Sequence, residues 1–232
     1  MSKNFPQSQR IKIGSDIELL AFQCQDTVFQ FAYIAPGASL KLHQHPESQI
    51  GMVISGKMEM NINGHKEVLK PLQQVYAVGA NVPHGAVNCS STETIFSLDV
   101  KRLVNSSVSE EILNLSPTKD TATDLIYQAA TGSWFEIAIA KIPTGVKIKS
   151  QQSDTEEIGI VLSGEMLITV GNEQQQVKTG EIYYAPANIV NEGYNLTTEE
   201  VTLIKILFFK QPLNREQDFC VINSVGKLTS TA

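Results

Sequence analysis

The 232-residue chain repeats itself, and this repeat restricts the fold more than any other feature of the sequence. The segment IGMVISGKMEMNING, which begins at Ile50, aligns without a gap with IGIVLSGEMLITVGN, which begins at Ile158, a shift of 108 residues. The same shift brings Tyr76 onto Tyr184. Similarity at a fixed shift is typical of duplicated structural units. We therefore predict two units of one fold, covering residues 1–115 and 116–232.

Within each unit the hydrophobic pattern has the period of strands. Short alternating or β-branched runs, such as FQFAYIA and KMEMNING, are separated by Gly, Pro and Asn. Asn63 and Gly64 form a two-residue hairpin signal. Only the polar linker 106–124 is expected to hold one short helix. We predict an all-β chain of two tandem barrels, because a jelly-roll barrel is one standard way to protect exposed strand edges.

Composition limits the partners of this chain. Its formal net charge is −6 and its pI is about 5.3, whereas binding to nucleic acids or anionic membranes requires positive charge. No segment approaches the roughly 18 consecutive apolar residues of a membrane span. Three cysteines without a CxxC pair predict a reduced, cytoplasmic protein. Because exposed sheet edges often pair between molecules, we expect a homodimer.

Four residues are candidate metal ligands: His43, His45, Gln49 and His84. His43 and His45 stand two apart at the end of the alternating run GASLKLHQH, and residues two apart in a strand face the same side. Gln49 begins the next predicted strand, and His84 lies in the turn-rich segment GANVPHGAVN. Three imidazoles and one oxygen donor suit one divalent transition metal, such as Fe, Co, Zn, Ni or Mn. A surface HxH pair that binds nothing is the alternative interpretation.

The spacing of these ligands resembles the two-part motif of the cupin superfamily. The pattern is Gly37-x5-His43-x-His45-x3-Gln49-x6-Gly56, followed by Pro83-His84-x3-Asn88. The resemblance implies a bicupin whose N-terminal jelly-roll barrel holds the four ligands in its mouth. Gln49 departs from most cupins, which carry Glu there. A neutral amide leaves more positive charge on the metal and favours an anionic, chelating substrate.

The second unit lacks the histidines. A shift of 108 carries the four ligand positions to Gln151, Ser153, Glu157 and Glu192. Without imidazoles a tight transition-metal site is not expected, although an oxygen-rich pocket could hold a hard cation weakly. We expect the C-terminal barrel to serve as a scaffold or lid.

Longer segments resemble one group of bicupins. The runs HQHPESQIGMVISG, VPHGAVN, SLDVKRL, WFEIAIAKIP and ILFFKQPLNR are similar to those of the BacB-like isomerases of bacilysin (antibiotic) biosynthesis and of the aeruginosin-pathway cupins. The resemblance covers about residues 20 to 215. It implies a metal-dependent isomerase that moves a ring double bond of dihydro-4-hydroxyphenylpyruvate, a small anionic 2-oxo acid. The missing histidines of the second unit depart from the BacB-like pattern.

Four further residues are candidates for binding or catalysis. Arg102 and Lys41 could bind the substrate carboxylate, although ion pairs at a domain boundary or rim explain both as well. Tyr33 is a substrate-binding candidate and Tyr76 a catalytic one by strand position, although inward tyrosines are more often core. Two alternative functions stay open. One is an Fe(II)-dependent dioxygenase, and the other is a non-enzymatic cupin that binds a small molecule.

Overall fold

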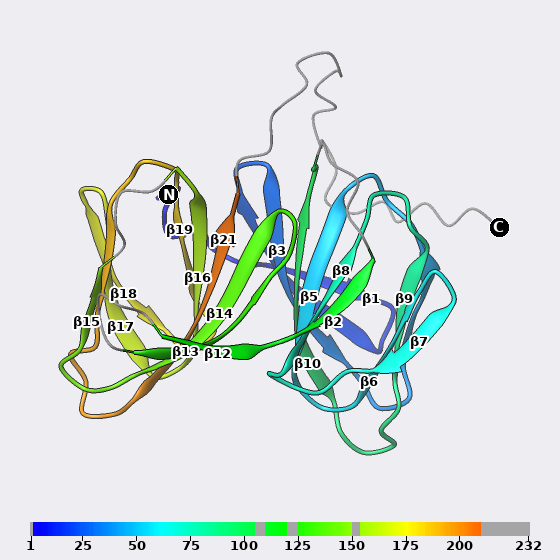
Figure 1. Ribbon diagram of the computed structural model, residues 1–232. Coiled ribbons are helices and arrows are strands. Elements are labelled where there is room, and N and C mark those ends of the chain that lie inside the picture. The colour runs from blue at the N-terminus through cyan, green and yellow to red at the C-terminus, as the bar shows by residue number, and fades with distance from the viewer. Residues whose placement is uncertain (1, 105–109, 120–124, 150–153, 210–232) are drawn as a thin grey trace, which may run out of the picture.

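The structure is a computed structural model that describes residues 2–104, 110–119, 125–149 and 154–209. Every regular element within these ranges is a β-strand, and the strands form four antiparallel sheets. Figure 1 shows them as two barrels side by side. This arrangement confirms the prediction of an all-β chain of two tandem barrels. No helix of the described chain is long and apolar enough to cross a membrane.

The first barrel combines a seven-stranded and a four-stranded sheet. Their orders are β1-β2-β3-β10-β5-β8-β11 and β4-β9-β6-β7. The strands are β1 (Gln9–Ile13), β2 (Ile17–Cys24), β3 (Thr27–Ile34), β4 (Ser39–His43), β5 (Ser48–Ser55), β6 (Met58–Ile62), β7 (His65–Val68), β8 (Gln74–Val78), β9 (His84–Asn88), β10 (Ile95–Arg102) and β11 (Glu111–Asn114). The predicted Asn63-Gly64 turn joins β6 to β7, with both residues at positive φ.

The second barrel repeats this plan with a six-stranded and a four-stranded sheet. Their orders are β12-β13-β14-β21-β16-β19 and β15-β20-β17-β18. The strands are β12 (Ser116–Lys119), β13 (Ile126–Thr131), β14 (Phe135–Ile142), β15 (Lys147–Lys149), β16 (Glu156–Ser163), β17 (Glu165–Val170), β18 (Glu173–Lys178), β19 (Ile182–Ala185), β20 (Asn191–Tyr194) and β21 (Val201–Phe208).

Three hydrophobic cores hold the molecule together. One fills the first barrel and includes Val53 and Met60, and another fills the second barrel and includes Val161 and Ile168. The third is the largest and lies between the two big sheets, where Trp134 is buried. Successive residues of a strand point to opposite faces. The big sheets therefore carry apolar residues on both faces, one for their own barrel and one for the other barrel.

The structure corrects the alignment of the two halves at one point. Gly51 pairs with Tyr76 in the first barrel, and its repeat counterpart Gly159 pairs with Tyr183 in the second. The counterpart of Tyr76 is therefore Tyr183 and not Tyr184. The shift drops from 108 to 107 because the second half is one residue shorter where the chain enters β19. In a strand, an error of one residue exchanges the two faces.

The segments that join the barrels differ from the prediction as well. The predicted short helix of the linker is absent from its described part, residues 110–119, where β11 and β12 form instead. β11 pairs with β8 at the edge of the first barrel. Residue 115 separates β11 from β12, and we retain it as the proposed domain boundary.

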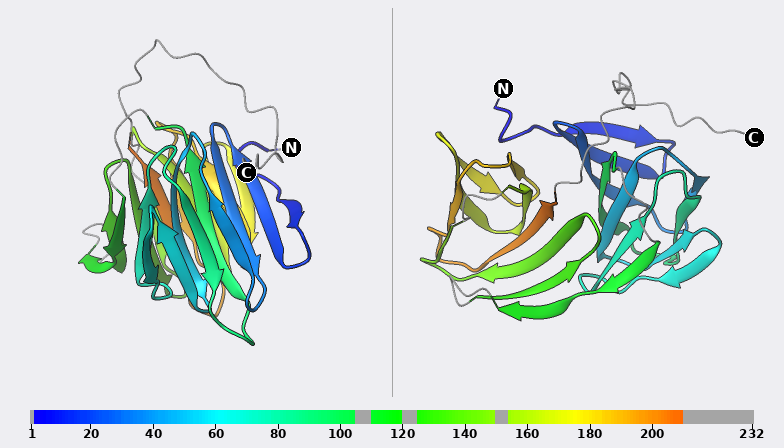
Figure 2. Two further views of the ribbon diagram at one scale, coloured as in Figure 1. Left: turned by 90° about the vertical axis from the view of Figure 1, so that its right-hand side faces the viewer. Right: turned by 45° about the horizontal axis from the view of Figure 1, so that its top comes forward.

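The N-terminal segment covers the corresponding edge of the second barrel. The amide of Tyr184 in β19 donates a 2.8 Å hydrogen bond to the carbonyl of Asn4. Phe5 inserts into the core of the second barrel, where it is 4% exposed. Figures 1 and 2 show this segment running from β1 to the second barrel. Both covering segments therefore come from the first 115 residues, which supply β11 to the first barrel and the N-terminal segment to the second.

Candidate metal centre

Three histidines converge in the first barrel. His43 ends β4 and pairs directly with His84, the first residue of β9, while His45 follows two residues after β4. Their ring centroids lie 4.5 Å (His43 to His84), 4.9 Å (His45 to His84) and 5.8 Å (His43 to His45) apart. One nitrogen from each ring lies within 4.8 Å of the others. The structure therefore brings together the three predicted histidine ligands.

Backbone carbonyl groups fix the orientation of all three rings. The Nδ1 atoms of His43, His45 and His84 lie 2.9, 3.0 and 2.8 Å from the carbonyl oxygens of Lys41, Glu47 and Val82. A carbonyl only accepts hydrogen bonds, so each Nδ1 carries a proton, and in a neutral ring this leaves the lone pair on Nε2. Metal-binding histidines commonly have such a backbone or carboxylate partner.

Burial keeps two of these rings neutral. It is the main cause that lowers the pKa of His43 below its ordinary value and that of His84 to about 4. The Nε2 atom of His84 is also buried without a hydrogen-bond partner in the structure. A buried polar atom without a partner is costly unless something binds it. A metal ion would supply the missing partner.

Gln49 completes the set with an oxygen. Its Oε1 lies 3.0 Å from the Nε2 of His45, while its Nε2 donates hydrogen bonds to the Tyr76 hydroxyl (3.0 Å) and to Asp99 Oδ1 (2.9 Å). The amide nitrogen must face Asp99, because an ionised carboxylate only accepts. The amide oxygen therefore faces the histidines. In a neutral His45 ring with its proton on Nδ1, this oxygen meets a nitrogen lone pair, and a cation bound to both atoms would relieve the repulsion.

Two residues of the first barrel hold Gln49 in this position. A Cβ atom on Gly51 would lie 2.4 Å from the ring of Tyr76, so glycine allows the tyrosine to cross beneath β5. The Tyr76 hydroxyl donates to Asp99 and accepts from Gln49. Burial, followed by the charge of Asp99, raises the pKa of Tyr76 well above its ordinary value, whereas burial raises that of Asp99. Tyr76 therefore stays protonated and supports the ligand.

The donor set fits a transition metal. Metal–nitrogen and metal–oxygen bonds are about 2.0–2.2 Å, so neighbouring ligands of one ion lie roughly 3 Å apart. The Gln49–His45 separation has this value. His43, His45, Gln49 and His84 would be the ligands, and all four donors would be neutral, because an imidazole binds a metal through an unprotonated nitrogen. Four neutral donors leave the full charge of a divalent ion available to an anionic molecule.

The structure does not bring Arg102 or Tyr33 to the histidines. The guanidinium of Arg102 binds both carboxylate oxygens of Glu156 in the second barrel, at 3.0 and 3.1 Å, and lies over the ring of Phe208. Tyr33 stacks on Phe96, with ring centroids 4.8 Å apart, and packs against the core between the barrels. Both side chains occupy the face of their sheet that points away from the metal centre. Neither is placed to contact a molecule bound there.

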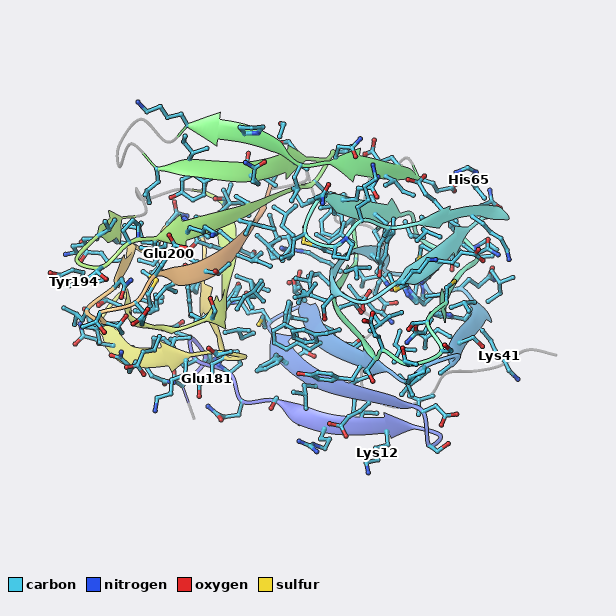
Figure 3. All side chains as sticks on the ribbon, turned by 90° about the horizontal axis from the view of Figure 1, so that it is seen from below. Lys12, Lys41, His65, Glu181, Tyr194 and Glu200 are labelled. Carbon is cyan, nitrogen blue, oxygen red and sulfur yellow. The ribbon has the colours of Figure 1, made fainter. Side chains whose placement is uncertain are left out.

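Lys41 lies outside the site as well. Its carbonyl holds His43, but its side chain is exposed, and Figure 3 shows it at the edge of the molecule. The pairing of β4 is irregular between Leu40 and His43, so the alternation that would put Lys41 and His43 on the same face of the strand is interrupted. The catalytic candidate Tyr76 does lie at the site, where it reaches the ligand set through Gln49.

Sequence reasoning missed Asp99 and Lys101. Both belong to the run SLDVKRL, and in the sheet Asp99 pairs with Gly51 and Lys101 with Gln49. Both therefore share the inward face with the ligand. Because successive residues of a strand point to opposite faces, Asp99 and Lys101 lie on one face, and Leu98, Val100 and Arg102 lie on the other. Once the apolar face is known to contact the other barrel, this pattern places Asp99 and Lys101 inside their own barrel.

In the second barrel an ion pair occupies the place of the Gln49 network. Glu157 is 3% exposed, accepts a 2.6 Å hydrogen bond from the hydroxyl of Tyr183, and lies 3.0 Å from the ammonium of Lys205. Their pairing positions match those of Gln49, Tyr76 and Asp99. The carboxylate here already has a cation. A metal is not needed to neutralise it.

The other second-barrel positions also differ from a metal site. The alignment places Asn191 at the position of His84, since Asn191 pairs with Val170 as His84 pairs with Ile62. Glu192, the counterpart predicted from the sequence, instead lies 2.6 Å from Lys147 at the surface. Gln151 and Ser153 lie outside the described residues.

Comparisons with known proteins agree with this architecture. The family model described as "Cupin domain" matches residues 30–101 and 138–207. The chain is 27% identical over 209 residues to an H2HPP isomerase of Bacillus subtilis, which covers 88% of each protein. The crystal structure of AerE from Microcystis aeruginosa is 44% identical and superposes with a TM-score of 0.87 over 90% of this chain and 100% of AerE.

A more distant similarity shows the fold alone. Oxalate decarboxylase from Bacillus subtilis superposes with a TM-score of 0.71 over 88% of this chain and 75% of its own, at 13% identity.

Proposed function

The chain belongs to the cupin domain family, and we propose that it is a metal-dependent isomerase that shifts a double bond in a cyclohexadienyl 2-oxo acid. The proposed substrate is dihydro-4-hydroxyphenylpyruvate. Its proposed place is the biosynthesis of specialised peptides of the antibiotic type. The similarity to an H2HPP isomerase and to AerE supports this reaction.

One observation carries the proposal. Three histidines, each with Nδ1 bonded to a carbonyl, direct their Nε2 atoms to one point, and Gln49 Oε1 joins them. The ligand set has no charge, so an anionic chelating molecule is favoured over water. A 2-oxo acid carries two oxygens suited to chelation, one on the carboxylate and one on the keto group.

The residues divide the chemistry between them. A bound divalent ion would supply Lewis acidity, which lowers the pKa of the carbon next to the keto group. Gln49, held by Tyr76 and Asp99, keeps its oxygen on the ligand side. The reaction removes a proton beside the keto group and returns one further along the conjugated system, so the double bond moves without a change of oxidation state.

An anaerobic assay tests the proposal. The metal-free protein is reconstituted separately with Fe(II), Co(II) and Zn(II), and the ultraviolet absorbance of dihydro-4-hydroxyphenylpyruvate is followed. We expect a metal-dependent change that His43→Ala abolishes. No change with any metal would refute the isomerase.

An Fe(II)-dependent dioxygenase is the second candidate, because a three-histidine site with open positions also suits oxygen chemistry. Oxygen consumption by the Fe(II) form in air with a 2-oxo acid, together with inactivity under nitrogen, would favour it. Full activity of the Zn(II) form without oxygen would exclude it, because Zn(II) is not redox-active.

A further inference from the structure

One cation faces the metal centre. Lys101 lies on β10 directly opposite Gln49 on β5, and the two residues share the inward face of the sheet. Its positive charge acts on His43 and His84, where it helps to lower both pKa values. Among the residues that the structure describes, no carboxylate lies within ion-pair distance of its ammonium group. Lys101 is therefore a half-buried charge beside the ligands without a salt bridge.

The charges around the ligands leave room for an anion. Asp99 and Glu47 are the carboxylates that act on Lys101, so the three groups together carry a formal charge of −1. A divalent ion held by the four neutral ligands changes this sum to +1. One carboxylate would restore neutrality. A buried site with uncompensated charge is unfavourable, so an arriving carboxylate is stabilised there.

The two other cationic candidates, Arg102 and Lys41, are not placed to bind an anion at the metal centre. Arg102 is already bidentate on Glu156, and Lys41 is exposed outside the barrel. Burial lowers the pKa of Lys101, while Asp99 and Glu47 raise it. These two carboxylates favour the charged ammonium.

We propose that Lys101 binds the carboxylate of the anionic 2-oxo acid at the metal centre. One carboxylate oxygen and the keto oxygen are then available to the metal, while the second carboxylate oxygen accepts a hydrogen bond from Nζ. The inference rests on the proposed substrate class. It holds for an isomerase and for a dioxygenase alike, because both would bind the same anion.

Binding to the full-length Co(II) protein tests the inference without turnover. Phenylpyruvate serves as the anionic probe and imidazole as a neutral ligand of the metal, and both are titrated by visible absorbance of Co(II). The variants are Lys101→Met, which keeps an unbranched side chain, and Lys101→Arg, which keeps the charge. Lys66→Met on β7 is the matched control, because that lysine is exposed and pairs with Glu59 at the surface.

We expect Lys101→Met to raise the dissociation constant of phenylpyruvate about ten- to one-hundredfold, the loss of a charge-assisted hydrogen bond. Its affinities for Co(II) and imidazole should match those of the wild-type protein within about threefold. Lys101→Arg should recover part of the loss, and Lys66→Met should bind as the wild-type protein does.

Four outcomes would overturn the inference. Unchanged phenylpyruvate binding by Lys101→Met would exclude the ion pair. Equal losses for phenylpyruvate and imidazole would show that the lysine only supports the fold. A larger loss in Lys41→Met would place the anchor at the rim. A wild-type Co(II) protein that binds imidazole but not phenylpyruvate would also refute the proposed substrate class, whereas the first three outcomes leave it intact.

Discussion

Replacing Gln49 by glutamate should destabilise the metal-free protein, although glutamate is the usual cupin residue at this position. The Gln49 Nε2 donates to Asp99 Oδ1 at 2.9 Å. In Gln49→Glu an oxygen takes the place of this nitrogen and faces a second carboxylate. Tyr76 already donates its only proton to Asp99. No hydrogen atom is therefore available to form a hydrogen bond between the two carboxylates.

The magnitude follows from the distance. Two unit charges 2.9 Å apart repel by about 6 kcal/mol at an effective dielectric constant of about 20. Protonating one carboxyl group with an ordinary pKa of about 4.3 costs about 4 kcal/mol at pH 7 and about 1 kcal/mol at pH 5. Protonating one carboxyl group costs less free energy than keeping both charged, so the cost of protonation determines the loss of stability. We expect Gln49→Glu to lower the free energy of unfolding by about 4 kcal/mol at pH 7 and by about 1 kcal/mol at pH 5.

Equilibrium urea unfolding of the metal-free protein measures this loss, followed by circular dichroism and by the fluorescence of Trp134, the single tryptophan. The double variant Gln49→Glu, Asp99→Asn is the matched control. It moves the carboxylate to the ligand position and places an amide donor opposite it, so stability should return to within about 1 kcal/mol of the wild-type protein. A loss that does not depend on pH, or one that Asp99→Asn does not reverse, would refute the reasoning.

Three further results are expected. The pKa of His84 is about 4 in the folded protein, against 6.5 for a histidine in the unfolded chain. The stability that the neutral ring contributes is therefore fully present above pH 6.5, and the free energy of unfolding falls by about 3 kcal/mol as the pH falls towards 4. In metal-free His84→Gln the free energy of unfolding should depend correspondingly less on pH. Glu157→Gln removes the carboxylate that pairs with Lys205 and should cost about 3 kcal/mol in urea unfolding, with unchanged Co(II) affinity in the first barrel. Phe5→Ala opens a cavity in the second barrel and should lower the melting temperature by roughly 5–10 °C in calorimetry, whereas an unchanged value would show that the N-terminal segment is not anchored.

The candidate metal site was predictable because its residues follow local rules. His43 and His45 are separated by one residue, and the wider motif that includes Gln49 and His84 resembles that of a known family. The supporting groups were not predictable in this way. Asp99 is 50 residues from Gln49 and reaches it only through the pairing of β5 with β10. Arg102, chosen for its chemistry, lies one residue beyond Lys101 and so points to the opposite face.

By itself, the sequence determined the duplication, the β-strands and the difference between the halves, because each depends on residue types and short spacings. The absence of histidine after His84 alone rules out a second three-histidine site. Tertiary structure decided which face of each strand is inside. Both faces of the big sheets are apolar, so hydrophobic alternation cannot separate the barrel interior from the contact between barrels. A single-residue change in the repeat then decides whether Tyr183 or Tyr184 faces the second barrel's interior, and only strand register resolves it.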